Sequence, residues 1–221
     1  HDALPILARH HTSCEIYAHA SAGCLHIRPF LNLKRESGKR DLRRIAEQAV
    51  ALTLSLGGSV SGEHGDGLAR GEWLERMYGP RIIEAFRMVK QAADPHSILN
   101  PGKLVSSTPG GALPRMDENL RYPHDYHTEL AWSPNLDFSS QGGLAGAIEQ
   151  CNGAGVCRKA DGVMCPSFQA TQDEMHSTRG RANLLRALIS GKLQGTDWGL
   201  PAVKEAMDLC LACKGCKSEC P

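Results

Sequence analysis

The chain has 221 residues, 41% of them hydrophobic, which is enough to bury a core in one or two domains. Its 25 Lys and Arg residues nearly balance its 24 Asp and Glu residues, and the net charge of +1 does not favour nucleic acid or a charged membrane surface as a partner. No run of about eighteen apolar residues occurs, so we expect no membrane-spanning helix.

The first predicted elements are two strands and a helix. Residues 13–33 contain two apolar-rich, partly alternating runs separated by Ser21-Ala-Gly23, a pattern typical of a strand pair. Residues 41–56 repeat apolar side chains at helical spacing and stop at Gly57-Gly58, so we expect a helix that ends at these glycines.

A loop, two more helices and a turn follow. Residues 59–67 form a glycine-rich loop, and a short helix is expected at 72–77. A longer helix is expected at 80–93, because proline suits its first turn and Asp94-Pro95 closes the pattern. The residues at 100–103 predict a turn.

The remainder divides into a linker and a cysteine-rich domain. Residues 106–150 are rich in Pro, Gly, Ser and Asn without sustained periodicity, which indicates a linker or an extended segment. Helices are expected at 177–189 and 201–209. We therefore predict an α+β protein with a first domain at 1–105 and a second, mostly helical domain at 151–221. The chain opens and closes abruptly, so we expect a fragment, truncated at the start of the first domain and the end of the second.

The chain ends in a C-x2-C-x2-C-x3-C-P run, the spacing that holds thiolates around a cubane iron–sulfur cluster. Thiolates two residues apart can turn inward on one short loop, and the trailing Pro221 ends that loop. The four cysteines of the run are Cys210, Cys213, Cys216 and Cys220. The spacing therefore predicts a [4Fe–4S] cluster and electron transfer.

An earlier, incomplete copy of the run occurs at 151–166. Ala154 stands where its second cysteine would be, and Cys165-Pro166 supplies the trailing pair. In two-cluster ferredoxins the fourth cysteine of each run ligates the other cluster. One predicted cluster therefore binds Cys210, Cys213, Cys216 and Cys165, and the second binds Cys151, Cys157 and Cys220. With three thiolates, the second site suits a [3Fe–4S] cluster or a [4Fe–4S] cluster with a non-cysteine fourth ligand.

Zinc is the alternative metal, since C-x2-C pairs also form structural zinc sites. The triple spacing favours iron–sulfur clusters and a reducing cytoplasm. Arg179 and Arg181, at the start of the helix expected at 177–189, place two positive charges near the cysteine loops. This charge would favour reduced clusters, and a solvated basic helix end is the alternative. The isolated Cys14 and Cys24 are expected to be small buried hydrophobes.

Histidines and a glutamate form a second group of candidate ligands. His19 and His26 lie on either side of a small-residue turn, and the glycine-rich loop adds Glu63 and His64. Two imidazoles and a carboxylate suit a divalent cation with open coordination positions. Histidines are also common on surfaces and in satisfied cores, and spacing alone does not decide between the two.

Three segments resemble the FAD-linked oxidase C-terminal domain of vanillyl-alcohol-oxidase-type flavoproteins, in the branch with D-2-hydroxyglutarate dehydrogenase, D-lactate dehydrogenase and glycolate oxidase flavin subunits. The segments are residues 19–26, Ser61-Gly-Glu-His-Gly-Asp-Gly67, and Asp94-Pro95 with Leu99-Asn-Pro-Gly-Lys103. The cysteine half resembles the iron–sulfur part of large fused bacterial FAD/iron–sulfur oxidoreductases. The resemblance implies an antiparallel sheet with helices, followed by a two-motif ferredoxin-like domain.

The resemblance also implies roles for individual residues. His19, His26 and Glu63 would hold a divalent metal such as Zn, Mn or Fe, and His64 would be the base that takes a proton from a 2-hydroxyacid. Simpler members of the family have Gly-Asp-Gly-Asn between the histidines, whereas this chain has Ala-Ser-Ala-Gly-Cys-Leu, followed after the second histidine by Arg28. Arg28 is expected either to bind a substrate carboxylate or to pair with an internal acid.

The implied cofactor is FAD, held mainly by an upstream domain outside this chain, and the implied substrates are of the D-2-hydroxyglutarate or D-lactate and glycolate class. Electrons would pass from FAD through the clusters to a quinone or a carrier protein, in the cytoplasm or peripherally at the inner membrane. Two alternative functions are an electron-transfer subunit without its own active site and a zinc-stabilised interaction module.

Overall fold

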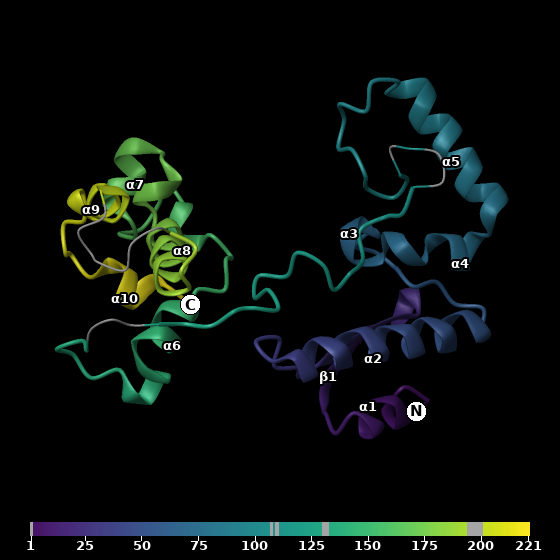
Figure 1. Ribbon diagram of the computed structural model, residues 1–221, viewed down its shortest axis with the longest axis horizontal. Helices are drawn as coiled ribbons and strands as arrows, with labels where there is room; N and C mark the ends of the chain where they lie inside the picture. The colour runs from purple at the N-terminus through teal and green to yellow at the C-terminus, as the bar shows by residue number, and fades with distance from the viewer. Residues whose placement is uncertain (1, 107, 109–110, 130–132, 194–200) are drawn as a thin grey trace. The chain divides into compact units, whose positions relative to one another are not determined.

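The computed structural model describes residues 2–106, 108, 111–129, 133–193 and 201–221. The chain forms two compact units, His1–Asp125 and Tyr126–Pro221 (Figure 1). The first unit contains a two-stranded antiparallel sheet and helices, and the described part of the second unit is built of helices and loops. This confirms the α+β class. The units divide inside the segment 106–150, where we expected a linker.

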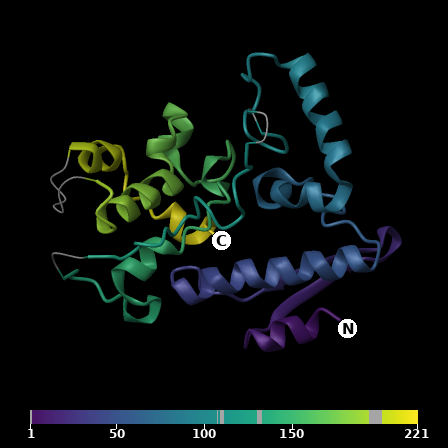
Figure 2. The same ribbon diagram turned by 45° about the vertical axis from the view of Figure 1, so that its right-hand side comes forward.

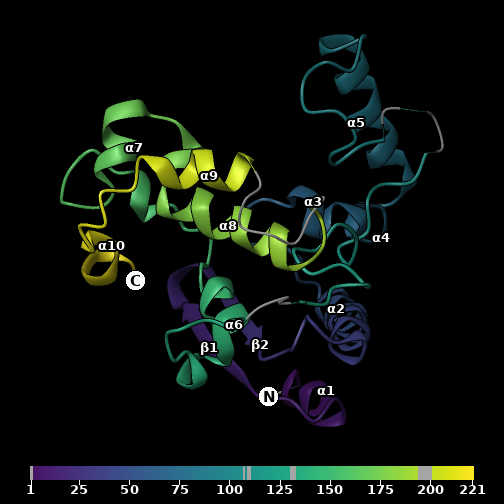
Figure 3. The same ribbon diagram turned by 60° about the vertical axis from the view of Figure 1, so that its left-hand side comes forward.

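The sheet pairs β1 (Cys14–His19) with β2 (Cys24–Pro29), as the alternating runs predict, and the strands lie side by side in Figure 3. Its register places Tyr17 opposite His26, and His19 opposite Cys24. Since side chains alternate between the faces of a sheet, these residues share one face with Arg28.

The opposite face of the sheet belongs to the core of the first unit. Cys14 and Ile27 pack there against a cluster of buried residues from two helices, α1 (Leu4–Arg9) and α2 (Glu36–Ser55), beside the strands in Figure 2. The cluster consists of Ile6, Leu7 and Ile45. Helix α2 begins before the predicted 41–56, because the polar residues of its first turns hide the apolar period. Helix α1 is too short to show that period.

Three helices follow the glycine-rich loop. Short helices α3 (Gly67–Arg70) and α4 (Leu74–Tyr78) flank a 3₁₀ turn, η2 (Gly71–Trp73), where we predicted one short helix at 72–77. Helix α5 (Pro80–Ala93) has the predicted bounds.

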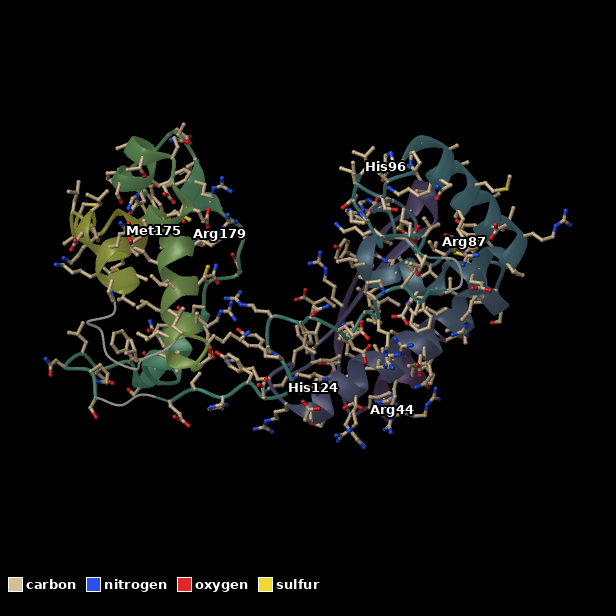
Figure 4. The ribbon with its side chains drawn as sticks, turned by 45° about the horizontal axis from the view of Figure 1, so that its top comes forward. Arg44, Arg87, His96, His124, Met175 and Arg179 are labelled. Carbon is tan, nitrogen blue, oxygen red and sulfur yellow. The ribbon has the colours of Figure 1, made fainter. Side chains whose placement is uncertain are left out.

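The chain from 115 to 124 lies along α2 instead of running free. The backbone N–H of Met116 donates to Glu72 Oε1 (2.7 Å), and Arg43 Nη1 donates to Glu72 Oε2 (2.6 Å). Lys39, which is buried, donates to the carbonyl of Pro123 (2.6 Å). His124 pairs with Glu36 beside the first turn of α2 (Figure 4). Residues 107, 109–110 and 130–132 of the expected linker lie outside the described residues.

The second unit is a cluster of short helices around a buried apolar centre. Its helices are α6 (Gly143–Glu149), α7 (Pro166–Thr171), α8 (Thr178–Ile189), α9 (Pro201–Asp208) and α10 (Gly215–Glu219), with 3₁₀ turns η3 (Ser139–Gln141), η4 (Val156–Arg158) and η5 (Glu174–His176). Helices α8 and α9 match the predicted 177–189 and 201–209 within a residue. The centre contains Met164, Phe168, Leu188, Val203 and Ala206. None of the helices in the described residues has the length and apolar character that a bilayer crossing requires.

Candidate functional site

Three imidazoles converge on one carboxylate oxygen in the first unit. Glu63 Oε1 lies 3.2 Å from His19 Nε2, 2.8 Å from His26 Nε2 and 3.0 Å from His64 Nε2. One donor atom from each of His19, His26 and Glu63 lies within 4.8 Å of the other two. The structure therefore brings all four predicted side chains of this group together.

The sheet and the glycine-rich loop position these side chains. His19 ends β1 and His26 lies in β2 on the same face, where its ring stacks on Tyr17 with centroids 4.4 Å apart. The loop comes so close to β2 that a Cβ on Gly62 would lie 2.9 Å from the Cys24 sulfur. Glycine at this position thus lets Glu63 reach the histidines.

The donor set fits a divalent cation. Two imidazole nitrogens and one carboxylate oxygen are ligands that Zn²⁺, Mn²⁺ and Fe²⁺ accept, and three protein ligands leave coordination positions open. His19 and His64 are largely exposed, so a small molecule can reach the group. The geometry supports a metal site with an accessible side.

Arg28 is exposed on the same face of the sheet as His19 and His26, and it donates to the Tyr17 hydroxyl. Its guanidinium carbon is 4.8 Å from the centre of the Tyr17 ring. In the register Arg28 is opposite Glu15, although its hydrogen bond goes to the tyrosine. The guanidinium is therefore oriented beside the histidines with donors left for an anion.

The second unit brings cysteines of both motifs to one cavity. Cys151, Cys157, Cys216 and Cys220 line a cavity of about 600 Å³. Burial raises the pKa of the Cys220 thiol, and the nearby sulfurs of the other three cysteines raise it further. Cys220 thus lies beside Cys151 and Cys157, the partners that the ferredoxin rule gives it.

Within the described residues, the group of ligand atoms close enough together to hold a single ion is that of His19, His26 and Glu63, and it contains no cysteine. Thiolates around a cluster are separated by the iron and sulfide that they enclose, so the roomy cavity beside the cysteines suits a cluster better than one zinc ion.

Cys165 lies at the start of α7 among hydrogen-bond donors. Its sulfur is 3.2 Å from Ser167 Oγ and 3.3 Å from Arg181 Nη1. Burial alone would raise the pKa of the Cys165 thiol, but these contacts and the backbone N–H of Phe168 outweigh it and hold the pKa below its usual value. Cys165 is therefore prepared to act as a thiolate ligand. Of its three expected partners, Cys210 and Cys213 are exposed between α9 and α10, and Cys216 lines the cavity with Cys151, Cys157 and Cys220.

Helix α8 and Glu219 hold the cysteine loops in place. Ser177 caps α8 through the N–H of Gly180 (2.8 Å), and the N–H of Arg179 donates to Cys157 Sγ (3.2 Å). Glu219 in α10 accepts the N–H groups of Val163 and Met164, which lower its pKa. The terminal motif is thus tied to the loop that precedes Cys165.

Sequence reasoning missed several residues of these sites. Tyr17 and Cys24 adjoin the histidines, and Cys24 Sγ is 3.7 Å from His26 Nε2, whereas we expected Cys24 to be a buried hydrophobe. Alternation in the two strands could have placed both on the histidine face. Ser167 and Glu219 also went unnoticed, because their contacts depend on tertiary packing.

Comparisons with known proteins separate the same two parts of the chain. Residues 1–104 match the family of FAD linked oxidases, C-terminal domain, and residues 147–221 match the 4Fe-4S dicluster domain. No solved structure was found to match the chain.

Several curated relatives are similar over nearly the whole chain. D-2-hydroxyglutarate dehydrogenase of Pantoea ananatis is 31% identical over 98% of this chain and 24% of its own length. The protein of that name from Pseudomonas putida is 34% identical over 93% of this chain and 23% of its own length. D-lactate dehydrogenase of Archaeoglobus fulgidus is 38% identical over 40% of this chain and 19% of its own length.

The chain spans about a quarter of the length of the relatives that it matches throughout. Their similarity runs across both of its parts, and the order of the parts agrees with the sequence prediction. The chain therefore contains a segment similar to the C-terminal domain of FAD linked oxidases, followed by a segment similar to the 4Fe-4S dicluster domain.

Proposed function

We propose that the chain is the substrate-binding and electron-carrying part of a flavin-linked D-2-hydroxyacid dehydrogenase. The observation that supports this most is the convergence of His19, His26 and His64 on Glu63. The relatives named D-2-hydroxyglutarate dehydrogenase suggest the substrate class, with D-lactate and glycolate as the alternatives.

His19, His26 and Glu63 would hold the divalent metal, which supplies a positive charge that orients the hydroxyl and carboxylate oxygens of a 2-hydroxyacid. Arg28, on the same face of the sheet, would bind a carboxylate of the substrate. His64, exposed beside Glu63, would take the hydroxyl proton as general base. These side chains bind and orient the substrate and receive its proton.

The oxidation converts the hydroxyl carbon to a carbonyl with loss of one proton and one hydride. FAD, which we propose is held mainly by a domain outside residues 1–221, would supply the hydride acceptor. The cysteines of the second unit would hold one [4Fe–4S] cluster and a second cluster, which carry electrons singly to a quinone or a carrier protein. Free thiols at cluster spacing favour a reducing compartment, so we propose the cytoplasm or the inner face of the inner membrane as the location.

The test is His64→Asn in the flavin-loaded protein, with flavin reduction by the 2-hydroxyacid followed by rapid mixing. We expect the rate to fall by about 10²–10⁴-fold, the usual contribution of a general base. His96→Asn is the matched control, because His96 is exposed elsewhere in the same unit (Figure 4) and should leave the rate unchanged. Undiminished flavin reduction in His64→Asn would overturn the assignment of His64 as the general base.

A further inference from the structure

In the second unit, the buried guanidinium of Arg181 contacts the thiol of Cys165 in the position where a carboxylate counter-ion would usually lie. Arg181 is 8% exposed, and its guanidinium donates to three acceptors from separate segments. These are the carbonyl of Ala206 in α9 (Nε, 2.8 Å), Cys165 Sγ (Nη1, 3.3 Å) and Ser167 Oγ (Nη2, 2.9 Å). Within the described residues, no ion pair joins Arg181 to a carboxylate.

Burial of an unpaired guanidinium is unfavourable, since the charge loses its hydration without gaining an opposite charge. The carbonyl and the hydroxyl supply partial charges only. Among these three contacts, the Cys165 sulfur is the one that would carry a full negative charge, as the thiolate ligand of a cluster. An anionic group at Cys165 would therefore stabilise the buried guanidinium of Arg181.

The neighbouring Arg179, in contrast, has a carboxylate as its counter-ion. Arg179, two residues earlier on α8, donates through Nε and Nη2 to the two carboxylate oxygens of Glu174 (2.7 and 3.0 Å). Figure 4 labels it at the N-terminal end of the helix. Only its backbone N–H donates to a cysteine sulfur, that of Cys157. At this end of α8, the Arg179 guanidinium thus pairs with a carboxylate, whereas the Arg181 guanidinium donates to a cysteine sulfur.

We propose that Arg181 is a positioning residue for the cluster bound by Cys165, which it orients and whose reduction potential it raises. The proposal rests on the proposed iron–sulfur function of the second unit. A reduced cluster carries one more negative charge than the oxidised one, so a buried cation bonded to a ligand sulfur stabilises the reduced form. Because the same guanidinium also bonds Ala206 and Ser167, its position relative to Cys165 is fixed.

The experiment is a potentiometric titration of the cluster-loaded protein with dithionite, followed by EPR, and needs no substrate. A Cys165→Ser variant assigns the signal of the cluster concerned. We expect Arg181→Met to shift the midpoint potential of that cluster to a more negative value and to leave the other cluster nearly unchanged. Arg181→Lys should also shift it negatively, since one ammonium cannot span the three acceptors.

Two further variants separate a specific bond from general charge. Arg179→Met removes the same charge from the same helix and should shift the Cys165-bound cluster less than Arg181→Met does. Ser167→Ala keeps the guanidinium and removes a hydroxyl that contacts both Arg181 and Cys165 Sγ, so a smaller negative shift is expected. Arg181→Lys decides the matter if Arg181→Met loads poorly. Equal shifts in Arg179→Met and Arg181→Met, or a wild-type potential in Arg181→Lys, would overturn the proposal.

The proposal for Arg181 and the proposed dehydrogenase function can fail independently of each other. Clusters that dithionite reduces and the 2-hydroxyacid does not would reject the dehydrogenase function and still measure the effect of Arg181. A protein that binds zinc and no iron–sulfur cluster would overturn both.

Discussion

Gly62 determines how close the ligand loop comes to the sheet. Its missing Cβ would lie 2.9 Å from Cys24 Sγ, closer than packed atoms allow. We predict that Gly62→Ala pushes Glu63 away from the histidines and weakens divalent-metal binding about tenfold, because overpacking costs about 1–3 kcal/mol and 1.4 kcal/mol is a factor of ten. Metal titration by calorimetry measures the change.

The double variant Gly62→Ala/Cys24→Ala supplies the control. Removal of the Cys24 sulfur makes room for the new methyl group, so metal affinity should recover toward that of Cys24→Ala alone. If the metal affinity of the double variant does not recover, the contact between residues 62 and 24 is not the cause of the weaker metal binding.

Asp94 organises the loop after α5 that belongs to the motif Asp94-Pro95…Lys103. Its carboxylate accepts the N–H groups of Ile98 (2.9 Å) and Leu99 (2.8 Å) and pairs with Lys90. The bond from Lys90, with these two amides, holds the pKa of Asp94 below its usual value. A depressed pKa means that the ionised form stabilises the fold at neutral pH, and this stabilisation is lost as the pH falls through the folded-state pKa.

We therefore predict that Asp94→Asn is less stable to urea than the unaltered protein at pH 7. The gap in unfolding free energy should narrow as the pH falls below about 4, the pKa of an unfolded-state aspartate, toward the lower pKa of Asp94 in the folded state. Urea unfolding of both proteins from pH 7 to pH 3 measures the gap. A gap that stays constant over this range would contradict the role of the charge.

At the scale of elements, the segment from 115 to 124 is fastened to α2 by charged side chains. Arg43 contacts Glu72, Asp117 and the Trp73 ring, and is only partly exposed. We predict that Arg43→Met destabilises the first unit by about 2 kcal/mol, less than the roughly 3–5 kcal/mol that loss of a fully buried ion-pair partner costs, because both side chains are partly exposed. Urea unfolding measures the change.

Arg44 is the matched control for this prediction. It is the next residue of α2 and is exposed, so Arg44→Met should change the free energy of unfolding by less than about 0.5 kcal/mol (Figure 4). Equal effects of the two substitutions would show that the contacts of Arg43 contribute no more than a surface charge.

Elements with a strong local signal were predictable from the sequence. The strand pair, α5 and α8 follow from alternation, helical period and end signals. Helix α6 and the 115–124 contacts were missed, since Gly143–Glu149 is short and glycine-containing and the contacts join residues far apart in the chain. Residue type suggested the candidate ligands and the family resemblance gave them roles, whereas spacing alone did not decide them. Their convergence on one oxygen of Glu63 was not predictable, because it depends on strand register and the close approach of Gly62.

At the scale of the whole molecule, the two units hold different sets of candidate ligands, histidines with a glutamate in the first and cysteines of two motifs in the second. Ala154 replaces the second cysteine of the motif and lines the same cavity as Cys151, Cys157 and Cys220. A side chain at 154 therefore faces the space where the second cluster is proposed to bind.

We predict that Ala154→Cys supplies the missing thiolate of this site. If the unaltered protein holds a [3Fe–4S] cluster there, its oxidised form gives an EPR signal, which should disappear in Ala154→Cys as a fourth iron is bound. The iron content should rise by one iron atom per chain. Cys220→Ser and Cys157→Ser, made separately, should each perturb this same cluster. The other cluster, assigned through Cys165, should keep its signal. An oxidised three-iron signal that persists in Ala154→Cys would show that residue 154 does not reach the cluster.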